Sequence, residues 1–255
     1  MRRIRLTIEY DGTRYAGWQR QANALAVQQV LEDALRRLTG EAITLHGASR
    51  TDAGVHALGQ SAHFDTDSRI PGEKFSYALN TMLPPDIRVC ASEDAPGDFH
   101  ARFSSKGKRY RYLFYVAPHT GAPNRNTHAH SIYPLNDARM QAEALALPGR
   151  HDFGAFAASG SIVKDTVRTI WRADVDRCGH EVRLIVEGNG FLYNMVRIIA
   201  GTLRDVGSGK LEPGALARAI ATGNRLDLGV TAPAHGLTLM EVFYSLPERA
   251  KGFMP

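Results

Sequence analysis

Hydrophobic residues change their spacing repeatedly over the first hundred positions, and the order of these spacings constrains the fold more than any other feature. Apolar residues at every second position indicate a strand, and apolar residues three and four apart indicate an amphipathic helix. The patterns predict strands at residues 4–10, 43–48, 60–65 and 87–91, and helices at residues 27–38 and 75–82. The order β-α-β-β-α-β is that of the ferredoxin-like, or RRM-like, split βαβ unit.

The second half of the chain repeats this alternation with added segments. We expect strands at residues 108–116, 166–176, 182–187 and 237–244, and helices at residues 137–147, 193–206 and 213–222. The sequence therefore predicts an α+β protein with two ferredoxin-like halves and mainly antiparallel sheets. A chain of 255 residues is long enough for two domains, which we expect at residues 1–105 and 106–255.

The chain is basic. It has 31 lysine and arginine residues against 26 aspartate and glutamate residues, a formal net charge of +5. Arginine accounts for 25 of the 31 basic residues, and its planar guanidinium matches phosphate groups and base edges. A basic surface is typical of nucleic-acid-binding proteins. An arginine excess that only reflects genomic base composition is the alternative interpretation of these counts.

Several common kinds of site are excluded by their missing motifs. The two cysteines, Cys90 and Cys178, are too few for a four-cysteine zinc site and too far apart for a zinc deaminase signature. The glycine-rich residues 207–210 lack the Ser or Thr of a phosphate-binding loop, because Leu211 follows them. No dinucleotide fingerprint, H-E-x-x-H motif or G-x-S-x-G motif occurs. We expect neither a metal nor a nucleotide cofactor.

No targeting or membrane signal is evident. The basic first residues lead directly into the first predicted strand, without the apolar core of a secretory signal. No run approaches the 18 apolar residues of a membrane-spanning helix. We expect a cytoplasmic protein with no membrane association.

Residues 46–57 form the most unusual segment, H-G-A-S-R-T-D-A-G-V-H-A, between two predicted strands. It combines the carboxylate of Asp52 and the guanidinium of Arg50 with two hydroxyls and two histidines. Reactive groups are often carried on loops that a rigid sheet positions. The alternative is an ordinary turn in which Asp52 bonds its own backbone.

Two further segments combine basic and aromatic residues. Residues 98–112 interleave arginine and lysine with phenylalanine and tyrosine, which suits phosphate contacts together with base stacking. Tyr110, at the start of a predicted strand, is the best stacking candidate there, since Tyr112 and Phe114 are better explained as core. Arg197 lies off the apolar stripe of its predicted helix. This position on the helix, taken alone, indicates a solvated arginine.

These segments together resemble the tRNA pseudouridine synthase A family. The resemblance runs from about residue 3 to residue 245. Its most specific part is R-T-D-A-G-V-H-A at residues 50–57. It is accompanied by E-Y-D-G-T at residues 9–13, F-H-A-R-F at 99–103, K-R-Y-R-Y at 108–112 and M-V-R at 195–197.

The resemblance implies the pseudouridine synthase fold and an isomerase that acts in tRNA processing. The expected reaction converts uridine to pseudouridine at positions 38, 39 and 40 of the tRNA anticodon stem-loop. It involves no net oxidation or reduction, so no cofactor is implied. The target nucleotide must leave its stack before C1′ or C6 can be reached. The family is homodimeric, so the resemblance also implies a homodimer.

The resemblance also assigns roles to individual residues. Asp52 aligns with the essential aspartate, the expected nucleophile at C1′ or at C6, and Arg197 aligns with the basic residue that pairs with it. Tyr110 aligns with the tyrosine that stacks on the target base. Arg50 resembles the arginine that fills the space left by the flipped base. The family's tRNA-contacting segment corresponds to Phe99, His100, Ala101, Arg102 and Phe103.

The loop at residues 156–166 resembles a tRNA-contacting region by position only, and no residue is assigned there. Two other functions compete with the expected one. A non-catalytic RNA-binding protein with two RRM-like halves would explain the basic and aromatic residues, but it has no use for Asp52 and lacks the RRM signature. A pseudouridine synthase with another RNA target, such as rRNA, would share the catalytic residues.

Overall fold

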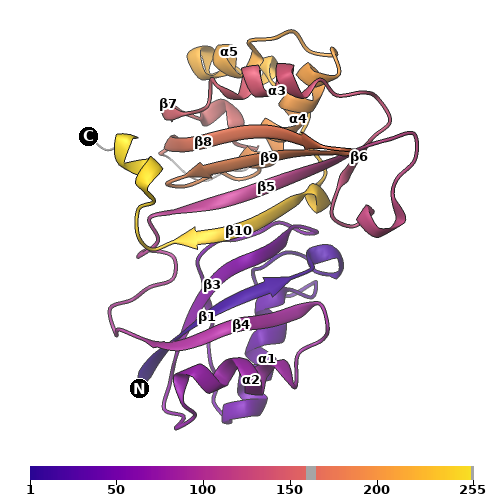
Figure 1. Ribbon diagram of the computed structural model, residues 1–255. Helices are drawn as coiled ribbons and strands as arrows, with labels where there is room; N and C mark the ends of the chain where they lie inside the picture. Colours follow the sequence, from indigo (N-terminus) through magenta and orange to yellow (C-terminus); the bar gives the residue numbers. More distant parts are fainter. Residues whose placement is uncertain (159–164, 254–255) are drawn as a thin grey trace. The chain divides into compact units, whose positions relative to one another are not determined.

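The computed structural model describes residues 1–158 and 165–253, which form two compact units. The first unit consists of Met1–Lys106 and Thr238–Ser245, and the second of Gly107–Leu237 and the residues from Leu246 onward. Both units combine helices with mainly antiparallel strands (Figure 1), which confirms the predicted α+β class. The expected domains, residues 1–105 and 106–255, and their ferredoxin-like description stay predictions.

The first unit has the predicted order of elements. Its strands are β1 (Arg2–Tyr10), β2 (His46–Gly47), β3 (His56–Thr66), β4 (Ile87–Ala95) and β10 (Leu237–Phe243). Its helices are α1 (Val27–Thr39) and α2 (Phe75–Asn80), which lie on one face of the sheet (Figure 1). The strands follow the order β4-β1-β3-β10, with β2 on β3. All these pairs are antiparallel except the parallel pair of β3 and β10.

Alternation in β1 explains why this sheet has one buried face. Ile4, Leu6 and Ile8 are fully buried, whereas Arg5 and Thr7 between them are partly exposed. In a strand, successive side chains point to opposite faces, so this pattern places an apolar layer against the helices. Helix α1 ends at Gly40, whose left-handed backbone (φ 76°) closes the last turn as glycine commonly does.

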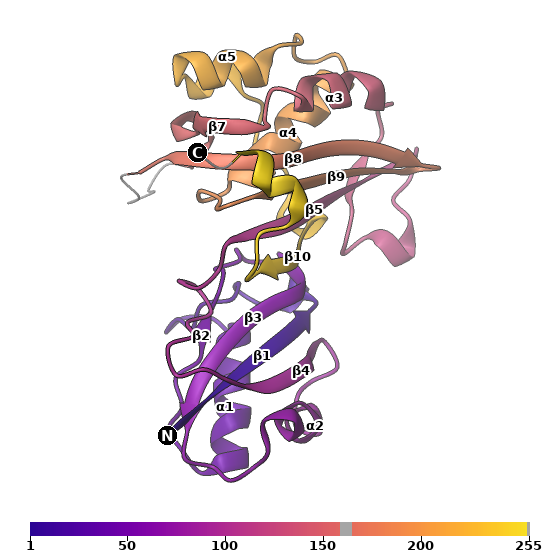
Figure 2. The same cartoon turned by 60° about the vertical axis from the view of Figure 1, so that its left-hand side comes forward.

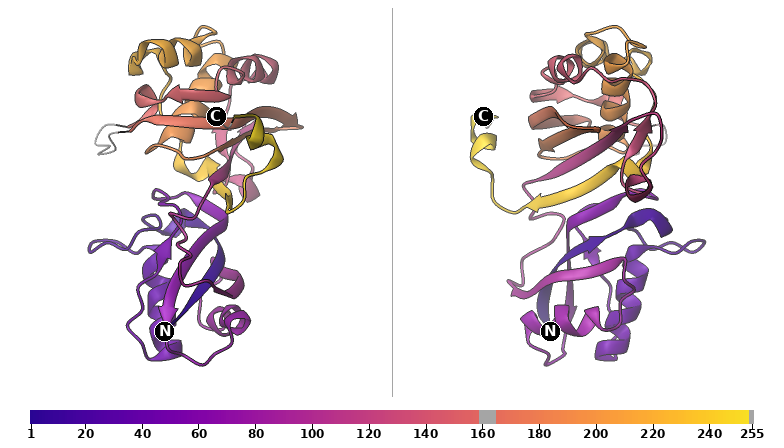
Figure 3. Two further views of the ribbon diagram at one scale, coloured as in Figure 1. Left: turned by 90° about the vertical axis from the view of Figure 1, so that its left-hand side faces the viewer. Right: turned by 45° about the vertical axis from the view of Figure 1, so that its right-hand side comes forward.

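The second unit contains the strands β5 (Gly107–Val116), β6 (Ala129–Ser131), β7 (Gly149–Asp152), β8 (Val167–Cys178) and β9 (Glu181–Gly188). The sheet order is β5-β9-β8-β7, all antiparallel, with β6 parallel to β5. The helices are α3 (Asp137–Ala144), α4 (Met195–Gly207) and α5 (Ala215–Thr222), which gather on one face of this sheet (Figure 3). The short strands β6 and β7 were not expected from the sequence.

Several strands have other bounds than the sequence predicts, because pairing with distant strands decides where each one begins and ends. The strand expected at residues 43–48 is reduced to His46–Gly47, because only these two residues pair with β3. The strand expected at residues 60–65 begins four residues earlier, at His56, where it meets Thr238 of β10. The predicted apolar stripe of α4 is confirmed, since its members are at most 1% exposed: Met195, Ile198, Ile199, Thr202, Leu203 and Val206.

Buried Glu143 of α3 supports the start of α5. Its carboxylate accepts the backbone N–H of Gly214 (2.6 Å) and of Leu216 (2.7 Å), two donors that have no partner within a helix. Glu143→Ala should therefore lower the free energy of unfolding by about 3 kcal/mol, since two buried donors lose a charged acceptor. Urea denaturation measures the loss. Glu248→Ala, at an exposed glutamate that pairs with the exposed Lys251, should change stability by less than about 0.5 kcal/mol.

Candidate active site

The loop that carries Asp52 is a tight turn anchored at both ends. The backbone N–H of Val55 donates to the carbonyl of Asp52 (3.1 Å), which closes a turn around Ala53 and Gly54. On the other side, the buried amide of Gln60 both accepts from the N–H of Ser49 and donates to its carbonyl (3.2 and 2.7 Å). The Asp52 side chain is partly exposed at this turn, and Arg50 is exposed beside it.

A segment near the N-terminus holds the middle of this loop. The Tyr10 hydroxyl lies 2.7 Å from the Thr51 hydroxyl, and both residues are buried. The backbone N–H of Trp18 donates to the Thr51 carbonyl (3.1 Å). Buried groups that are hydrogen-bonded on two sides have little freedom to move. Thr51 is therefore fixed, and with it the backbone next to Asp52.

Gly17 is required where the two segments meet. Its φ of +88° is left-handed, and a β-carbon there would lie 2.3 Å from the Thr51 carbonyl oxygen. The same segment also serves α1, whose first N–H groups, at Val27 and Gln28, donate to the carbonyls of Gly17 and Trp18. These bonds replace the side-chain cap that Ala26 cannot provide. The start of α1 and the Asp52 loop thus share one support.

Residues 99–103 form a second exposed feature of the first unit. Ala101 is fully buried; its N–H donates to Nδ1 of His63 (3.1 Å), and its carbonyl accepts from the Tyr244 hydroxyl (2.8 Å). Arg102 is exposed, and Phe103 is 77% exposed. The segment therefore has a buried anchor and presents a guanidinium and an aromatic ring to solvent.

His100 of this segment lies close to two other histidines, His46 and His63. The ring of His63 is 5.0 Å from that of His46 and 4.6 Å from that of His100, measured between centroids. Burial, followed by the neighbouring His100 and His46, lowers the pKa of His63 to about 4. Burial also lowers the pKa of His100. Nδ1 of His63 accepts the Ala101 N–H, so this contact requires that nitrogen to be unprotonated.

The second unit contains the other two predicted catalytic residues. Tyr110 on β5 is 6% exposed, and its ring meets that of Phe191 edge-on, with centroids 5.1 Å apart. Phe191 lies just before α4, the helix that contains Arg197. Edge-to-face aromatic pairs are favourable, so Phe191 fixes the plane of the tyrosine ring. Tyr112 and Phe114 are fully buried, as expected of core residues.

Arg197 is fixed by its surroundings and is not the freely solvated arginine that its position on the helix suggested. Its Nε donates to the Ala232 carbonyl (2.9 Å), and one terminal nitrogen donates to the Asn194 side-chain oxygen (2.7 Å). The backbone carbonyl of Arg197 also accepts the N–H of Ala232 (3.0 Å). Asn194 adopts a left-handed conformation (φ 61°), which asparagine tolerates better than most residues.

The hydrogen-bond acceptors of Arg197, Ala232 and Asn194, were not predicted from the sequence. Ala232 acts through its backbone, which leaves no side-chain signal, whereas Asn194 directly before an apolar helix is a recognisable start signal. Gly201 makes the contact possible, since a β-carbon there would overlap the Val230 carbonyl oxygen. The chain around residues 230–232 therefore packs directly on α4.

The predicted site residues fall into both units. Arg50, Asp52 and residues 99–103 belong to the first unit, and Tyr110 and Arg197 to the second. Residues 159–164, within the loop noted for its position at residues 156–166, lie outside the described part of the chain. No group of histidine, cysteine, aspartate or glutamate side chains arranged to hold a metal ion is found within residues 1–158 and 165–253. None of the helices in these ranges is long and apolar enough to cross a membrane.

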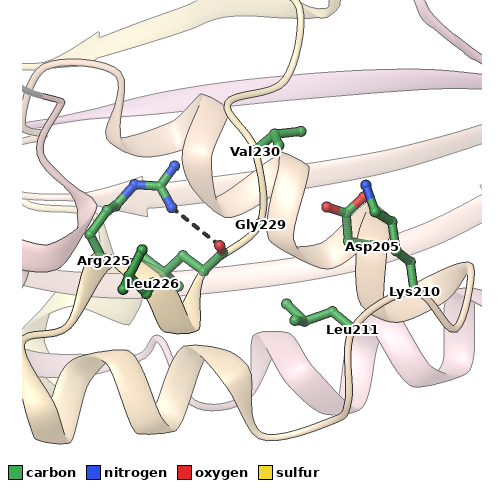
Figure 4. Close-up of a pocket in the computed structure, with 8 residues that line it drawn as sticks. Asp205, Lys210, Leu211, Arg225, Leu226, Gly229 and Val230 are labelled. Atoms are coloured by element: carbon green, nitrogen blue, oxygen red, sulfur yellow. Dashed lines mark hydrogen bonds between the residues drawn. The ribbon is translucent and has the colours of Figure 1, made fainter.

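A cavity of about 510 Å³ in the second unit is separate from the predicted residues (Figure 4). Its wall includes Asp205 of α4 and the chain after α5, where Arg225 donates to the Leu228 carbonyl (3.2 Å). None of the residues predicted to be catalytic or to bind substrate lines it. The lining residues are Asp205, Lys210, Leu211, Arg225, Leu226, Leu228, Gly229 and Val230.

Gly17→Ala should be strongly destabilising, because a left-handed backbone and a backbone clash act together. We expect a loss of about 3 kcal/mol or more in the free energy of unfolding, measured with urea. Gly40→Ala is the matched control: its φ of +76° is similar, but no atom lies within 4 Å of the added carbon. It should cost only about 1 kcal/mol. Equal losses in the two variants would contradict the role of the Thr51 contact.

The buried His63 should make stability depend on pH above the range where carboxylates titrate. Its pKa of about 4 in the folded protein is below its ordinary 6.5, so the unfolded chain binds the proton first as the pH falls. The contribution of His63 should therefore lower stability from about pH 6.5 down to about pH 4, by at most roughly 1.4 kcal/mol per pH unit. Urea denaturation at several pH values measures this slope.

The His63→Gln variant keeps a side-chain acceptor for Ala101 and removes the titration, so its stability should vary less in this range. His119→Gln, at an exposed histidine, should keep the wild-type dependence. The pKa of Asp65 is lowered by its hydrogen bond from Arg3, so its contribution is lost only at lower pH. A His63→Gln variant with the full wild-type slope would contradict this explanation.

Comparison with known proteins gives the family. A sequence profile described as tRNA pseudouridine synthase matches residues 6–104 and 144–245. A protein named tRNA pseudouridine synthase A from Ruminiclostridium cellulolyticum is 54% identical over 245 residues, 96% of this chain and 100% of that protein. One of the same name from Acetivibrio thermocellus is 51% identical over 244 residues, again 96% and 100%.

Two solved structures that match are far less similar, at 10% and 12% identity. An archaeal box H/ACA sRNP Nop10-Cbf5 complex matches with 10% identity and a TM-score of 0.36, over 79% of this chain and 44% of that chain. The profile covers most of the sequence and the two relatives are matched over their full length, so the chain belongs to the tRNA pseudouridine synthase family.

Proposed function

We propose that this enzyme isomerises uridine at positions 38, 39 and 40 of the tRNA anticodon stem-loop, with Asp52 as the nucleophile. Family membership makes the chain an isomerase that converts uridine in tRNA to pseudouridine. The target positions and the role of Asp52 are the proposal. The observation that supports it most is the anchoring of the Asp52 loop, which holds a carboxylate at a tight turn without burying it.

The reaction needs a carboxylate that is ionised and held in place. The N1–C1′ bond of uridine breaks, the uracil turns, and a C5–C1′ bond forms, while C5 loses a proton and N1 gains one. Asp52 would add to C1′ or to C6 and depart again, so no electrons are gained or lost. A nucleophile that is positioned in advance avoids the entropy cost of finding its geometry.

Other residues would bind and orient the nucleotide. Tyr110, whose ring Phe191 holds in plane, would stack on the target base. Arg197 would pair with the catalytic carboxylate; its hydrogen bonds to Ala232 and Asn194 fix the position of the guanidinium. A positive charge near an aspartate favours the ionised form. Arg50, exposed beside Asp52, would fill the space that the flipped base leaves.

The segment of Phe99, His100, Ala101, Arg102 and Phe103 would contact the tRNA. Its buried anchor at Ala101 and its exposed Arg102 and Phe103 support this role, since a cation and a ring serve phosphate and base together. We also infer, from the resemblance alone, a homodimer that acts in the cytoplasm. The strand order β4-β1-β3 with β2 on β3 supports a ferredoxin-like description of the first half.

The decisive test is tritium release from tRNA transcripts labelled at C5 of uridine, because C5 loses its hydrogen only when the new glycosidic bond forms. The wild type should release tritium, and Asp52→Asn should release none while it binds tRNA at least as tightly. Asp67→Asn removes an exposed carboxylate that pairs with the N-terminus, and it should behave like the wild type. Transcripts with a single labelled uridine at position 38, 39 or 40 test the target sites.

The other outcomes separate the competing functions. Release by both wild type and Asp52→Asn would keep the enzyme and remove the nucleophile. Tight binding without release from any anticodon-arm uridine, but with release from an rRNA fragment, would identify another target. Tight binding without release from either RNA would favour a non-catalytic RNA-binding protein.

A further inference from the structure

Strand register places one short segment of chain between Asp86 and the loop that carries Asp52. Strand β1 lies between β3 and β4 and is antiparallel to both (Figure 2). Tyr10, its last residue, pairs with Ala57 of β3 on one side and with Ile87 of β4 on the other. Antiparallel neighbours begin where β1 ends, so the chain that leaves β1 emerges between the starts of β3 and β4.

This segment, residues 11–15, is called the bridging segment below, and it packs backbone to backbone on the end of the Asp52 loop. The N–H of Gly12 donates to Nδ1 of His56, the first residue of β3 (3.0 Å). A β-carbon at Gly12 would lie 2.0 Å from the Val55 carbonyl oxygen, so only glycine permits this approach. The start of the bridging segment therefore fixes the point where the loop joins β3.

Tyr15 ends the bridging segment and holds the turn around Asp52 itself. Its carbonyl accepts the N–H of Gly54 (3.3 Å), the residue two positions after Asp52. The carbonyl of Thr51, one position before Asp52, accepts the N–H of Trp18 (3.1 Å). Main-chain hydrogen bonds thus reach the loop on both sides of the carboxylate, and Tyr15 provides one of them.

Asp86 holds the other side of the bridging segment with its backbone and with both carboxylate oxygens. Its carbonyl accepts the N–H of Asp11 (2.9 Å). Its Oδ1 accepts the hydroxyl of Tyr15 (2.7 Å), and its Oδ2 accepts Nε of Arg14 (2.8 Å). The Asp86 side chain is 14% exposed and Tyr15 is 4% exposed, so water competes little for the hydrogen bond between them.

The backbone of Asp86 is itself held in a turn. The N–H of Ile87 donates to the Pro84 carbonyl (3.1 Å), which closes a turn around Pro85 and Asp86. Proline restricts its own φ angle, so Pro85 limits the conformations that this turn can adopt. Asp86 therefore provides a fixed acceptor for the bridging segment.

The hydroxyl of Tyr15 is a lasting donor to this acceptor. Burial, followed by the neighbouring Asp86, raises the pKa of Tyr15 to about 12, so the hydroxyl keeps its proton at neutral pH. Hydrogen bonds to a carboxylate are shorter and roughly twice as strong as those between neutral groups. A buried ring that is bound at its far end has little freedom, and the backbone of the same residue is restricted with it.

We propose that Asp86 is a positioning residue for the isomerisation, which holds the Asp52 turn in its reactive geometry through Tyr15. The inference rests on the proposed function, because it takes Asp52 as the nucleophile. A displacement of about 1 Å can lower the rate of a reaction on the order of a hundredfold, so the loss of one support should be visible in the rate. The segment proposed to contact the tRNA, residues 99–103, is a different one, so affinity should not change.

The experiment measures single-turnover tritium release, with the full-length protein in saturating excess over a tRNA transcript labelled at C5 of uridine. Under this condition the rate constant does not depend on the fraction of the protein that is folded. Tyr15→Phe keeps the buried ring and removes only the hydroxyl. It should lower the rate constant by roughly tenfold and leave the Kd for tRNA within about twofold of the wild type. Asp86→Ala should lower the rate constant at least as much.

Asn80→Ala is the matched control for a general loss of stability. The Asn80 side chain donates to the Val89 carbonyl and accepts the Val89 N–H, both at 2.9 Å, within the same unit. Its loss should lower stability in urea at least as much as Tyr15→Phe does and should leave the rate constant unchanged. The double variant of Tyr15→Phe and Asp86→Ala should be no slower than Asp86→Ala, because the two residues act through one hydrogen bond.

Three results would overturn the inference. These are a wild-type rate constant in Tyr15→Phe and Asp86→Ala, an equal fall in Asn80→Ala, and effects of Tyr15→Phe and Asp86→Ala that multiply in the double variant. If Asp52→Asn releases no tritium while Tyr15→Phe and Asp86→Ala react at the wild-type rate, the inference alone is wrong. If Asp52→Asn releases tritium at the wild-type rate, the proposed nucleophile is wrong.

Discussion

The close approach of Gly17 to Thr51 is the contact on which the candidate active site most depends. The backbone of residues 17 and 18 receives the first N–H groups of α1 and donates to the loop that carries Asp52. A helix start, a strand connection and a carboxylate are therefore fixed relative to one another by main-chain bonds. Main-chain bonds vary little in length and direction, which suits a group whose position must be reproduced closely.

Arg197 is held by the same means in the second unit. Its guanidinium is directed by a carbonyl at Ala232 and by Asn194, and neither of these competes for its charge as a carboxylate would. Glu187 shows the opposite arrangement, since one buried carboxylate holds three arginines. The first arrangement uses uncharged groups to orient one cation, and the second uses one anion to hold three cations together.

Much of the fold was predictable, because the spacing of apolar residues along the sequence reflects which face of each strand or helix is buried. The alternation of Ile4, Leu6 and Ile8 and the stripe of α4 correspond directly to residues that the structure buries. For the candidate site, the motif at residues 50–57 singles out Asp52 in the sequence, and its catalytic role stays a prediction. The neighbours that fix the site were not predictable, because Gly17 and Ala232 act through their backbones. Pairing over long sequence distances, as between β3 and β10, also leaves no local signal, and it determined where β3 begins.

The parallel pairing of β10 with β3 has a consequence for synthesis of the protein. Thr238 pairs with His56, so the first unit is not complete until β10, far along the chain from β3, has left the ribosome. Until then, the edge of β3 that β10 later covers is an unpaired strand edge next to the Asp52 loop. Such edges invite association with other chains. The nascent protein thus carries the Asp52 loop beside a strand edge that stays open to misassembly until β10 has been made and has paired.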